Sequence, residues 1–469
     1  MRAPGVVAVA FVATLLPAGC VPSRSSLFDP IARSVQDRVG VRPEWRSGWS
    51  RSPAVESRIR ELLAKPLAAD AAAVIAVLNS PEIQSAYAEL GVVAASVASA
   101  RTVSNPQLSA ELRLPLDSGG EQQLELAAVQ SVSDLLAILP RVRAADANLK
   151  AARRRAVVVT IDVAARARAA VHEAIAATQR LAMRRLIAET AAASAELARA
   201  LHEAGNITDL DFTREAVFAE EAQLQVRSAE AEVVTARERA NAILGLSGSE
   251  TAWTASATLP DAPEQLAAQG DLEREAVASS LDLDALRWSL EAAGQEVGLA
   301  RMKSFLPDLG LGVGAEREGA FLGVGPIATL SIPLFDWGSG ERAAAWARVR
   351  RLQHRYTGVA LDMRAATRAA RARLVATHQR AVRMRTTVLP LRERLVDESF
   401  RQFNAMNVST FELITSRREH IEAEERYIDA LRDYWVAQTE VDQLRAGSLP
   451  GAWRGDGGTF RSEQEEQGR

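Results

Sequence analysis

Cysteine is nearly absent from this sequence, because its 469 residues contain only one. A single cysteine excludes an intramolecular disulfide and a cysteine-cluster metal site. Aromatic residues are also scarce, at 5%, and the formal net charge is -3. A charge so close to neutral provides no basic footprint for nucleic acid, so we expect no nucleic-acid partner. The charged fraction of 25% matches ordinary folded proteins and excludes wholesale disorder.

Signatures of catalysis are missing as well. The sequence has no phosphate-binding glycine loop and no Walker motif. Its five histidines, His172 among them, show no metal-ligand spacing, and we expect each on the polar face of a helix. Gly310, Gly312 and Gly314 alternate inside a strand-like stretch and do not form a nucleotide-binding loop. The sequence therefore predicts no enzyme activity, no cofactor and no bound metal.

The single cysteine follows an export signal. A basic residue precedes an apolar stretch at residues 6–16, which is too short to span a bilayer. Ala18 and Gly19 then precede Cys20. The segment resembles the lipobox of bacterial lipoproteins, with Pro17 at the position where leucine is usual, and this resemblance implies a lipid on Cys20. The alternative is an ordinary secretory signal that ends at the same small residues.

After a lead-in rich in proline, serine and arginine, the chain repeats one plan at an offset of about 200 residues. The letters Asn-Pro-Gln-Leu at 105–108 correspond to Leu-Pro-Asp-Leu at 306–309, and Gly-Asn-Ile-Thr at 205–208 to Met-Asn-Val-Ser at 406–409. We divide the chain into a signal peptide (1–19), a lipidated extended segment (20–69), a first repeat (70–246), a linker (247–270), a second repeat (271–447) and a flexible C-terminal tail (448–469).

Each repeat reads as helix, hairpin, long helix, turn and helix. The expected helices cover residues 70–103, 141–203 and 208–244 in the first copy, and 271–303, 341–404 and 409–445 in the second. At a rise of 1.5 Å per residue the long helices span roughly 95 Å, which is more than a globular domain needs. Pro390 interrupts the second long helix, and we expect a kink there.

The hairpins alternate in polarity as membrane-spanning strands do. In the first copy, Leu108, Ala110, Leu112, Leu114 and Leu116 fall on one face, and polar residues fall on the other. Each strand is about ten residues long, enough for a tilted strand to cross a bilayer. Four strands cannot close a barrel, and an open sheet edge cannot face lipid. A chain with these strands in a membrane must therefore oligomerise, to eight strands as a dimer or twelve as a trimer.

This order of features resembles the TolC-type outer-membrane factors, and the resemblance covers about residues 70–446. The resemblance implies a mainly α-helical fold with a small membrane β-barrel portion. It also implies a homotrimer in the outer-membrane lipid, with a twelve-stranded barrel continued by a periplasmic tube of helices. Its partners would be a periplasmic membrane-fusion adaptor and an inner-membrane pump, of which the resistance-nodulation-division (RND) type fits best. A lipid anchor fits the efflux branch of the family better than the secretion branch.

The inter-helix turns are the expected docking surface for the adaptor. The resemblance implies that these turns form the periplasmic tip. The tip comprises Gly205, Asn206, Ile207, Thr208, Met406, Asn407, Val408 and Ser409. Thr208 and Ser409 have the spacing of helix-capping hydroxyls. Asp209, Asp211 and Glu412 are candidates for acidic groups at the closing aperture, where symmetry would turn each into a ring. Because these turns are small and polar, we expect docking to depend on shape and hydrogen bonding.

Two other functions stay open at this point. An outlet for type I protein secretion would share the whole plan. A non-pore periplasmic coiled-coil lipoprotein would share the helices, although it would lack strands of membrane-spanning length. The adaptor itself is disfavoured, because it would carry a single helical hairpin and no duplication. The sequence does not identify the exported substrate.

Overall fold

The computed structural model describes residues 23–114, 122–267, 270–305, 308–318, 320–332 and 335–454. The predicted signal peptide, the candidate lipidation site Cys20 and the first hairpin turn at residues 117–120 lie outside these ranges. The described chain divides into two compact units. The sheet unit contains residues 89–152 and 286–354 together with the described residues up to Leu27, and the turn unit contains 28–88, 153–285 and 355–454. Each unit takes segments from both repeats, so neither unit coincides with one repeat.

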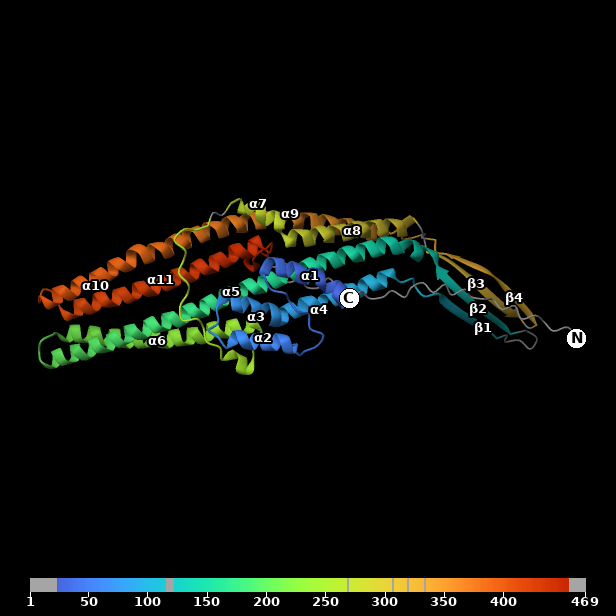
Figure 1. Ribbon diagram of the computed structural model, residues 1–469. Helices are drawn as coiled ribbons and strands as arrows, with labels where there is room; N and C mark the ends of the chain where they lie inside the picture. Colours follow the sequence, from blue (N-terminus) through green and yellow to red (C-terminus); the bar gives the residue numbers. More distant parts are fainter. Residues whose placement is uncertain are drawn as a thin grey trace. The chain divides into compact units, whose positions relative to one another are not determined.

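The helices follow the predicted duplication, and the predicted mainly α-helical fold class is confirmed (Figure 1). The first copy contains α3 (Ala69–Asn79), α4 (Pro81–Arg101), α5 (Val132–Glu203) and α6 (Asp209–Leu244), and the second contains α7 (Leu272–Ser279), α8 (Leu281–Phe305), α9 (Ser339–Arg383), α10 (Leu389–Asn404) and α11 (Thr410–Arg445). With 72 residues, α5 is about 110 Å long.

The first helix of each copy is broken, although we expected it to be continuous. Ser80 separates α3 from α4, and Ser280 separates α7 from α8. A glycine with a left-handed backbone packs against each break: Gly245 has φ +68° and Gly447 has φ +86°. A Cβ on Gly447 would lie 2.2 Å from the carbonyl oxygen of Ser279, so no other residue fits there. In both copies, therefore, a left-handed glycine packs against the break in the first helix.

Proline is accommodated differently in the two long helices. Helix α5 begins at Val132 instead of residue 141 and contains Pro140 in its interior. In the second copy, a π-helical turn at Met384–Val388 precedes Pro390. The N–H of Leu389 bonds to the carbonyl of Met384, five residues back. This wider turn takes up one additional residue just before Pro390. We had expected the missing proline donor to interrupt the helix at this point.

The N-terminal segment is not extended, which corrects the prediction for residues 20–69. It contains α1 (Arg24–Val39) and α2 (Pro53–Leu63). Leu27, Ile31 and Val35 recur every four residues along α1 and are buried. Proline and serine in this segment do not oppose helices, because Ser52 caps the start of α2 and Pro53 occupies its first position.

The start of the predicted flexible tail is ordered. Leu449 is buried, and its N–H donates to a carboxylate oxygen of Asp282 at 2.9 Å. Arg454 donates to the hydroxyl of Ser448 at 2.9 Å, and a short 3-10 helix occupies Gly451–Trp453. The prediction of a tail from residue 448 is therefore wrong for residues 448–454, because Leu449 adds an apolar anchor to the core. Residues 455–469 lie outside the described ranges.

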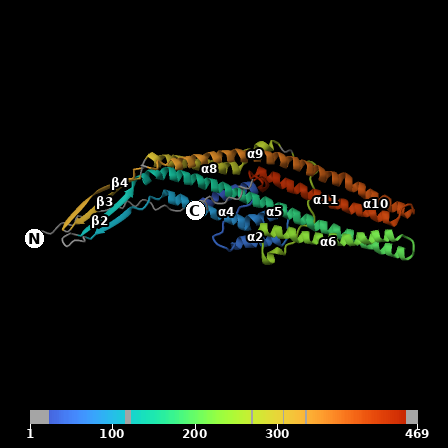
Figure 2. The ribbon, with the colours of Figure 1, turned by 180° about the vertical axis from the view of Figure 1, so that it is seen from behind.

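The four strands of the sheet unit form one antiparallel sheet in the order β1-β2-β3-β4 (Figure 2). They are β1 (Gln107–Arg113), β2 (Gln123–Ser131), β3 (Leu309–Glu318) and β4 (Phe321–Leu330). The hairpins of the two copies meet where β2 pairs with β3. Asp308 secures this junction by accepting hydrogen bonds from Ser131 at 2.7 Å and Ser133 at 2.8 Å.

Glycines in β3 allow the close approach of β2. A Cβ on Gly312 would lie 2.0 Å from the carbonyl oxygen of Ala128, whereas a Cβ on Gly325 in β4 would meet nothing within 4 Å. We therefore expect Gly312→Ala to destabilise the sheet by about 1–3 kcal/mol, the usual penalty of overpacking. Gly325→Ala is the matched control and should behave as the unaltered protein. Thermal unfolding of the two purified variants checks this, and equal melting temperatures would contradict it.

Candidate functional site

The strand register gathers the apolar residues on one face of the sheet. Leu108 lies opposite Ala128, which lies opposite Val313 on the next strand. Because directly opposed residues point to the same side, the apolar stripes of all four strands form one surface. This surface comprises Leu108, Ala110, Leu112, Leu124, Leu126, Ala128, Leu309, Leu311, Val313, Ala315, Leu322, Val324, Pro326, Ala328 and Leu330. Two polar residues share the face, because Gln130 lies opposite Leu311 and Arg317 lies opposite Leu124 and Leu322. The predicted alternation is thus confirmed and extends across the junction between the copies.

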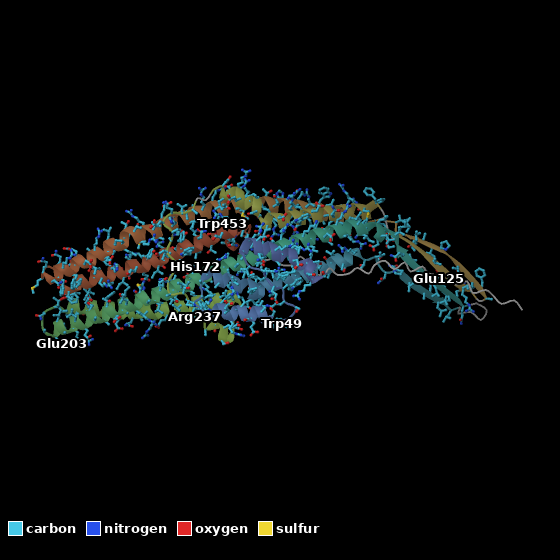
Figure 3. The ribbon with its side chains drawn as sticks, viewed as in Figure 1. Trp49, Glu125, His172, Glu203, Arg237 and Trp453 are labelled. Atoms are coloured by element: carbon cyan, nitrogen blue, oxygen red, sulfur yellow. The ribbon has the colours of Figure 1, made fainter. Side chains whose placement is uncertain are left out.

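The opposite face carries glycines and a row of three glutamates. Glu111 lies opposite Glu125, and Glu125 lies opposite Glu316. All three are exposed, and Figure 3 labels Glu125 on the sheet. Like charges directly opposite one another destabilise a sheet. Arg113, on the same face, offsets part of this repulsion, because its guanidinium lies 2.8 Å from the carboxylate of Glu111. Sequence reasoning missed it, because Glu316 joins the row only through the pairing of β2 with β3.

Large aromatic residues stand exposed just outside the strands. Phe305 precedes β3, and Phe335 and Trp337 follow β4. Aromatic side chains favour the boundary between a membrane and water. Among the residues that the structure describes, no helix combines the length and the hydropathy needed to cross a membrane.

Both candidate docking turns lie at the same end of the turn unit, where α5 meets α6 and α10 meets α11 (Figures 1 and 2). The two turns have the same backbone geometry. In the first, Gly205 N–H donates to His202 O at 2.8 Å and Asn206 N–H to Leu201 O at 2.8 Å. In the second, the N–H groups of Met406 and Asn407 bond to the equivalent carbonyls, each at 2.9 Å. This pairing is the Schellman ending of a helix, and it requires one residue in the left-handed conformation.

Each turn then starts the next helix with a hydroxyl cap, as predicted. The Thr208 hydroxyl accepts from the N–H of Asp211 at 3.2 Å, and the Ser409 hydroxyl accepts from the N–H of Glu412 at 3.2 Å. In the first turn the Thr208 hydroxyl also donates to the Asp211 carboxylate at 2.7 Å. The caps fix the start of α6 and α11 and so hold both turns in one shape.

The three acidic aperture candidates differ in their surroundings. Asp211 bonds to Thr208 and lies 3.7 Å from Arg214, so its charge is locally compensated. Asp209 and Glu412 are exposed, and an imidazole nitrogen of His202 lies 3.9 Å from a carboxylate oxygen of Asp209. The aperture role of all three residues stays a prediction, with Asp209 and Glu412 the more accessible of them.

Met406 is the most unusual residue of the turns. It has φ +60°, and no other described residue besides glycine has a positive φ. Glycine occupies the equivalent place in the first turn, where Gly205 has φ +74°. The left-handed conformation costs a residue with a side chain about 1–2 kcal/mol, yet the Met406 side chain is 93% exposed and gains little by packing. Strain of this kind concentrates at functional sites.

The turns are less polar than we expected. Leu210, in the first turn of α6, is 59% exposed, and Met406 of the other turn is 93% exposed. Ile207 and Val408 are only partly buried. A partner that docks here would therefore meet apolar as well as polar groups, while docking by shape and hydrogen bonding stays a prediction. Leu210 lies two residues after Thr208, so the sequence already placed an apolar side chain next to this turn.

Partly buried ion pairs join the helices behind the turns. Arg180 on α5 is buried and donates to Asp429 of α11 at 2.9 Å and to Glu232 of α6 at 2.6 Å. One turn further along α5, Arg184 bonds to Glu425 of α11 at 3.0 Å. Burial raises the pKa of Glu425, which Arg184 opposes. The two hairpins of the turn unit are thus joined at defined points and not only by apolar packing.

A duplicated helix–hairpin–helix chain with a four-stranded sheet, one apolar sheet face and paired helical turns has the architecture of an outer-membrane channel of the TolC type. No family model matches the chain. The cobalt-zinc-cadmium resistance protein CzcC of Cupriavidus metallidurans is 23% identical to it over 403 residues, which are 81% of this chain and 90% of that protein.

Solved structures show the same fold. A membrane protein from Pseudomonas aeruginosa matches with a TM-score of 0.68 at 17% identity, over 86% of this chain and 98% of that one. The MtrE outer membrane channel of Neisseria gonorrhoeae matches with a TM-score of 0.64 at 14% identity, over 84% and 90%. The CmeC outer membrane channel of Campylobacter jejuni gives 0.63 at 12% identity, over 87% and 90%. The predicted resemblance to outer-membrane factors is confirmed.

The strain at Met406 can be measured directly. Met406→Gly should raise the free energy of unfolding by up to about 1 kcal/mol, because it relieves left-handed strain of about 1–2 kcal/mol. The greater freedom of glycine in the unfolded chain offsets part of that gain. Met406→Ala keeps the strained backbone and is the matched control, so it should show no gain. Urea unfolding of the three purified proteins tests this, and a Met406→Gly protein no more stable than Met406→Ala would show that the turn is unstrained.

Proposed function

We propose that this protein is the outer-membrane channel of a tripartite efflux system and acts as a passive exit duct. The observation that carries the proposal is the two-faced sheet. One side is apolar except for Gln130 and Arg317, and the other side carries glycines and glutamates. An apolar surface suits lipid, and a polar opposite surface suits a water-filled lumen. A helical lipoprotein without a pore has no use for such a sheet.

A homotrimer completes the duct. One chain supplies four strands, whose open edges cannot face lipid. Three chains give twelve strands, enough for a closed barrel with a lumen. The long helices of the three chains then form a tube in the periplasm. Energy comes from an inner-membrane pump of the RND type, and a periplasmic membrane-fusion adaptor joins pump and duct.

The adaptor docks on the paired turns at residues 205–208 and 406–409. The support for this is the shared, capped geometry of the two turns, with exposed Met406 and Leu210 beside them. A strained, exposed methionine is a poor structural choice, and contact with a partner gives a reason to keep it.

The cargo that the lumen favours is cationic. Glu111, Glu125 and Glu316 lie side by side on the polar face of the sheet. Arg113 pairs with Glu111 at 2.8 Å and offsets its charge. Glu125 and Glu316, repeated in three chains, then form a ring of carboxylates, which attracts cations and repels anions. The relative CzcC is a cobalt-zinc-cadmium resistance protein, and divalent metal cations are the cargo that both observations support. An outlet for secreted proteins would gain nothing from such a ring.

Docking is tested by adding bulk to the turns, with a control variant that carries the same backbone strain. Gly205→Arg and Gly205→Ala both place a side chain in the left-handed conformation, but only arginine adds a large charged group. We expect Gly205→Arg, and likewise Asn407→Arg, to abolish export while outer-membrane abundance and trimer content stay unchanged. Gly205→Ala should retain most of the activity.

The readout is a cellular export or resistance assay, normalised to the amount of trimer in the outer membrane. Normal export by Gly205→Arg and Asn407→Arg at normal abundance would show that the adaptor docks elsewhere. Equal loss in Gly205→Ala would assign the defect to backbone strain.

The acidic row is tested by its effect on ion selectivity. Glu125→Gln removes the central charge of the row with little change in shape. The ratio of cation to anion permeability, measured from reversal potentials in planar bilayers, should fall by about twofold or more. Glu61→Gln on α2 removes an equivalent charge from an exposed surface helix and should leave the ratio unchanged. An unaltered ratio in Glu125→Gln would mean that permeating ions do not meet this row.

We also propose that Cys20 carries a lipid that anchors the mature chain in the outer membrane. The support is its position after an apolar stretch and two small residues. Mass spectrometry of the mature N-terminal peptide should find Cys20 as the first residue with acyl chains attached. An unmodified cysteine, or a chain that begins beyond residue 20, would leave an ordinary secretory signal as the explanation.

A further inference from the structure

The turn unit contains a cavity of about 700 Å³ along α5 and α11, away from the turns and the sheet faces discussed above. The end of α1, the start of α3 and the extended residues 256–260 complete its walls. The volume falls within the range of pockets that hold small organic ligands. Ile161, Ala165 and Ile175 of α5 give it an apolar wall.

A buried histidine without a hydrogen-bond partner lines one end of this cavity. His172, labelled in Figure 3, is 6% exposed, and its Nδ1 atom has no partner among the described residues. Its ring stacks on Trp435 of α11, with the ring centroids 5.6 Å apart. Burial lowers the pKa of His172 to about 4, so the ring is neutral at physiological pH. A buried, unpaired polar atom costs free energy that a ligand would recover.

The mouth of the cavity carries two exposed carboxylates, Asp37 and Asp442. One carboxylate oxygen of Asp442 accepts a hydrogen bond from the Gln438 amide at 2.9 Å, and its other oxygen is the one that we assign to a cation. Arg445 also lines the cavity, whereas two other guanidinium groups are held by other partners. Arg38 donates to the backbone oxygens of Ala446 and Ser279, at 2.5 and 3.3 Å, and Arg168 pairs with the exposed Asp70 at 3.0 Å.

The helix geometry sets the length of a suitable ligand. His172 lies beside Trp435, and Asp442 follows two turns later on α11. Seven residues at 1.5 Å each place the carboxylate about 10 Å along the helix from the histidine. A ligand that uses both groups therefore needs a cationic end and a hydrogen-bonding end with an apolar body between them. The ligand and its two hydrogen bonds together must span this distance.

We propose that this cavity is a binding site for a small aromatic amine. The ammonium group sits at Asp442, the ring lies against the apolar wall, and a hydroxyl at the far end bonds to Nδ1 of His172. A hydroxyl can donate or accept, so it satisfies either tautomer of the neutral ring. The site does not depend on the duct function, because none of its groups belongs to the sheet or the turns.

Tyramine is a fitting probe, because its ammonium and phenol groups are separated by an apolar body. Binding to the purified full-length protein is measured by isothermal titration calorimetry. Two analogues of the same length change only the charged end: tyrosol is neutral and 3-(4-hydroxyphenyl)propionate is anionic. A third, phenethylamine, lacks only the hydroxyl. We expect tyramine to bind at least about tenfold more tightly than tyrosol or the propionate, as one charge-assisted hydrogen bond provides.

Variants assign each contact. Asp442→Asn should weaken tyramine about tenfold, and Asp397→Asn, which removes an exposed charge from α10, should leave it unchanged. His172→Phe keeps an aromatic ring against Trp435 and should bind tyramine no better than phenethylamine. Undiminished phenethylamine binding to His172→Phe would show that this variant is folded.

Three results would overturn the proposal. They are no tyramine binding up to about 10 mM, equal binding of tyrosol, and tyramine binding that neither Asp442→Asn nor His172→Phe alters. Failure of export in the turn variants would leave this proposal untouched, since it concerns a different surface.

Discussion

The pairing of β2 with β3 is the contact on which the sheet depends, because it joins the hairpins of the two sequence copies. This pairing requires a glycine at position 312 of β3, because a Cβ there would overlap the carbonyl oxygen of Ala128. Once the strands are paired, the register places every apolar stripe on the same side. The same register aligns Glu125 with Glu316 on the other side. The pairing of β2 with β3 thus determines both where the apolar side chains gather and where the glutamates line up.

Local periodicity predicted most of the helices and the faces of the strands. The strict alternation around Leu112 and the apolar recurrence in the helical stretches involve residues close together in the sequence. Such local patterns are enough to indicate a strand or a helix and its apolar face. The prediction failed in the N-terminal segment, where its proline and serine content was taken as evidence against helices. Proline and serine in the N-terminal segment suggested an extended chain, whereas Ser52 and Pro53 are the start of a helix.

The candidate site was only partly predictable for a different reason. The turns and their caps were found because the hydroxyl and the capped N–H lie three residues apart in the sequence. The acidic row and the cavity at His172 depend on segments far apart in the chain, which no local pattern relates. The strain at Met406 escaped notice because methionine has no special preference for turns, and only the backbone angle reveals it.

The two copies use one solution for their helix breaks and their turns, but not for their long helices. Helix α5 continues unbroken to its turn, whereas α9 and α10 are separated by the π-helical turn at Met384–Val388. A π-helical turn takes up one additional residue within a single turn, so the sequence positions that share a helix face shift by one residue across it. A ring built from several such chains would alternate a long helix that contains this π-helical turn with one that lacks it. Such a ring has half the rotational symmetry that the duplicated sequence alone suggests.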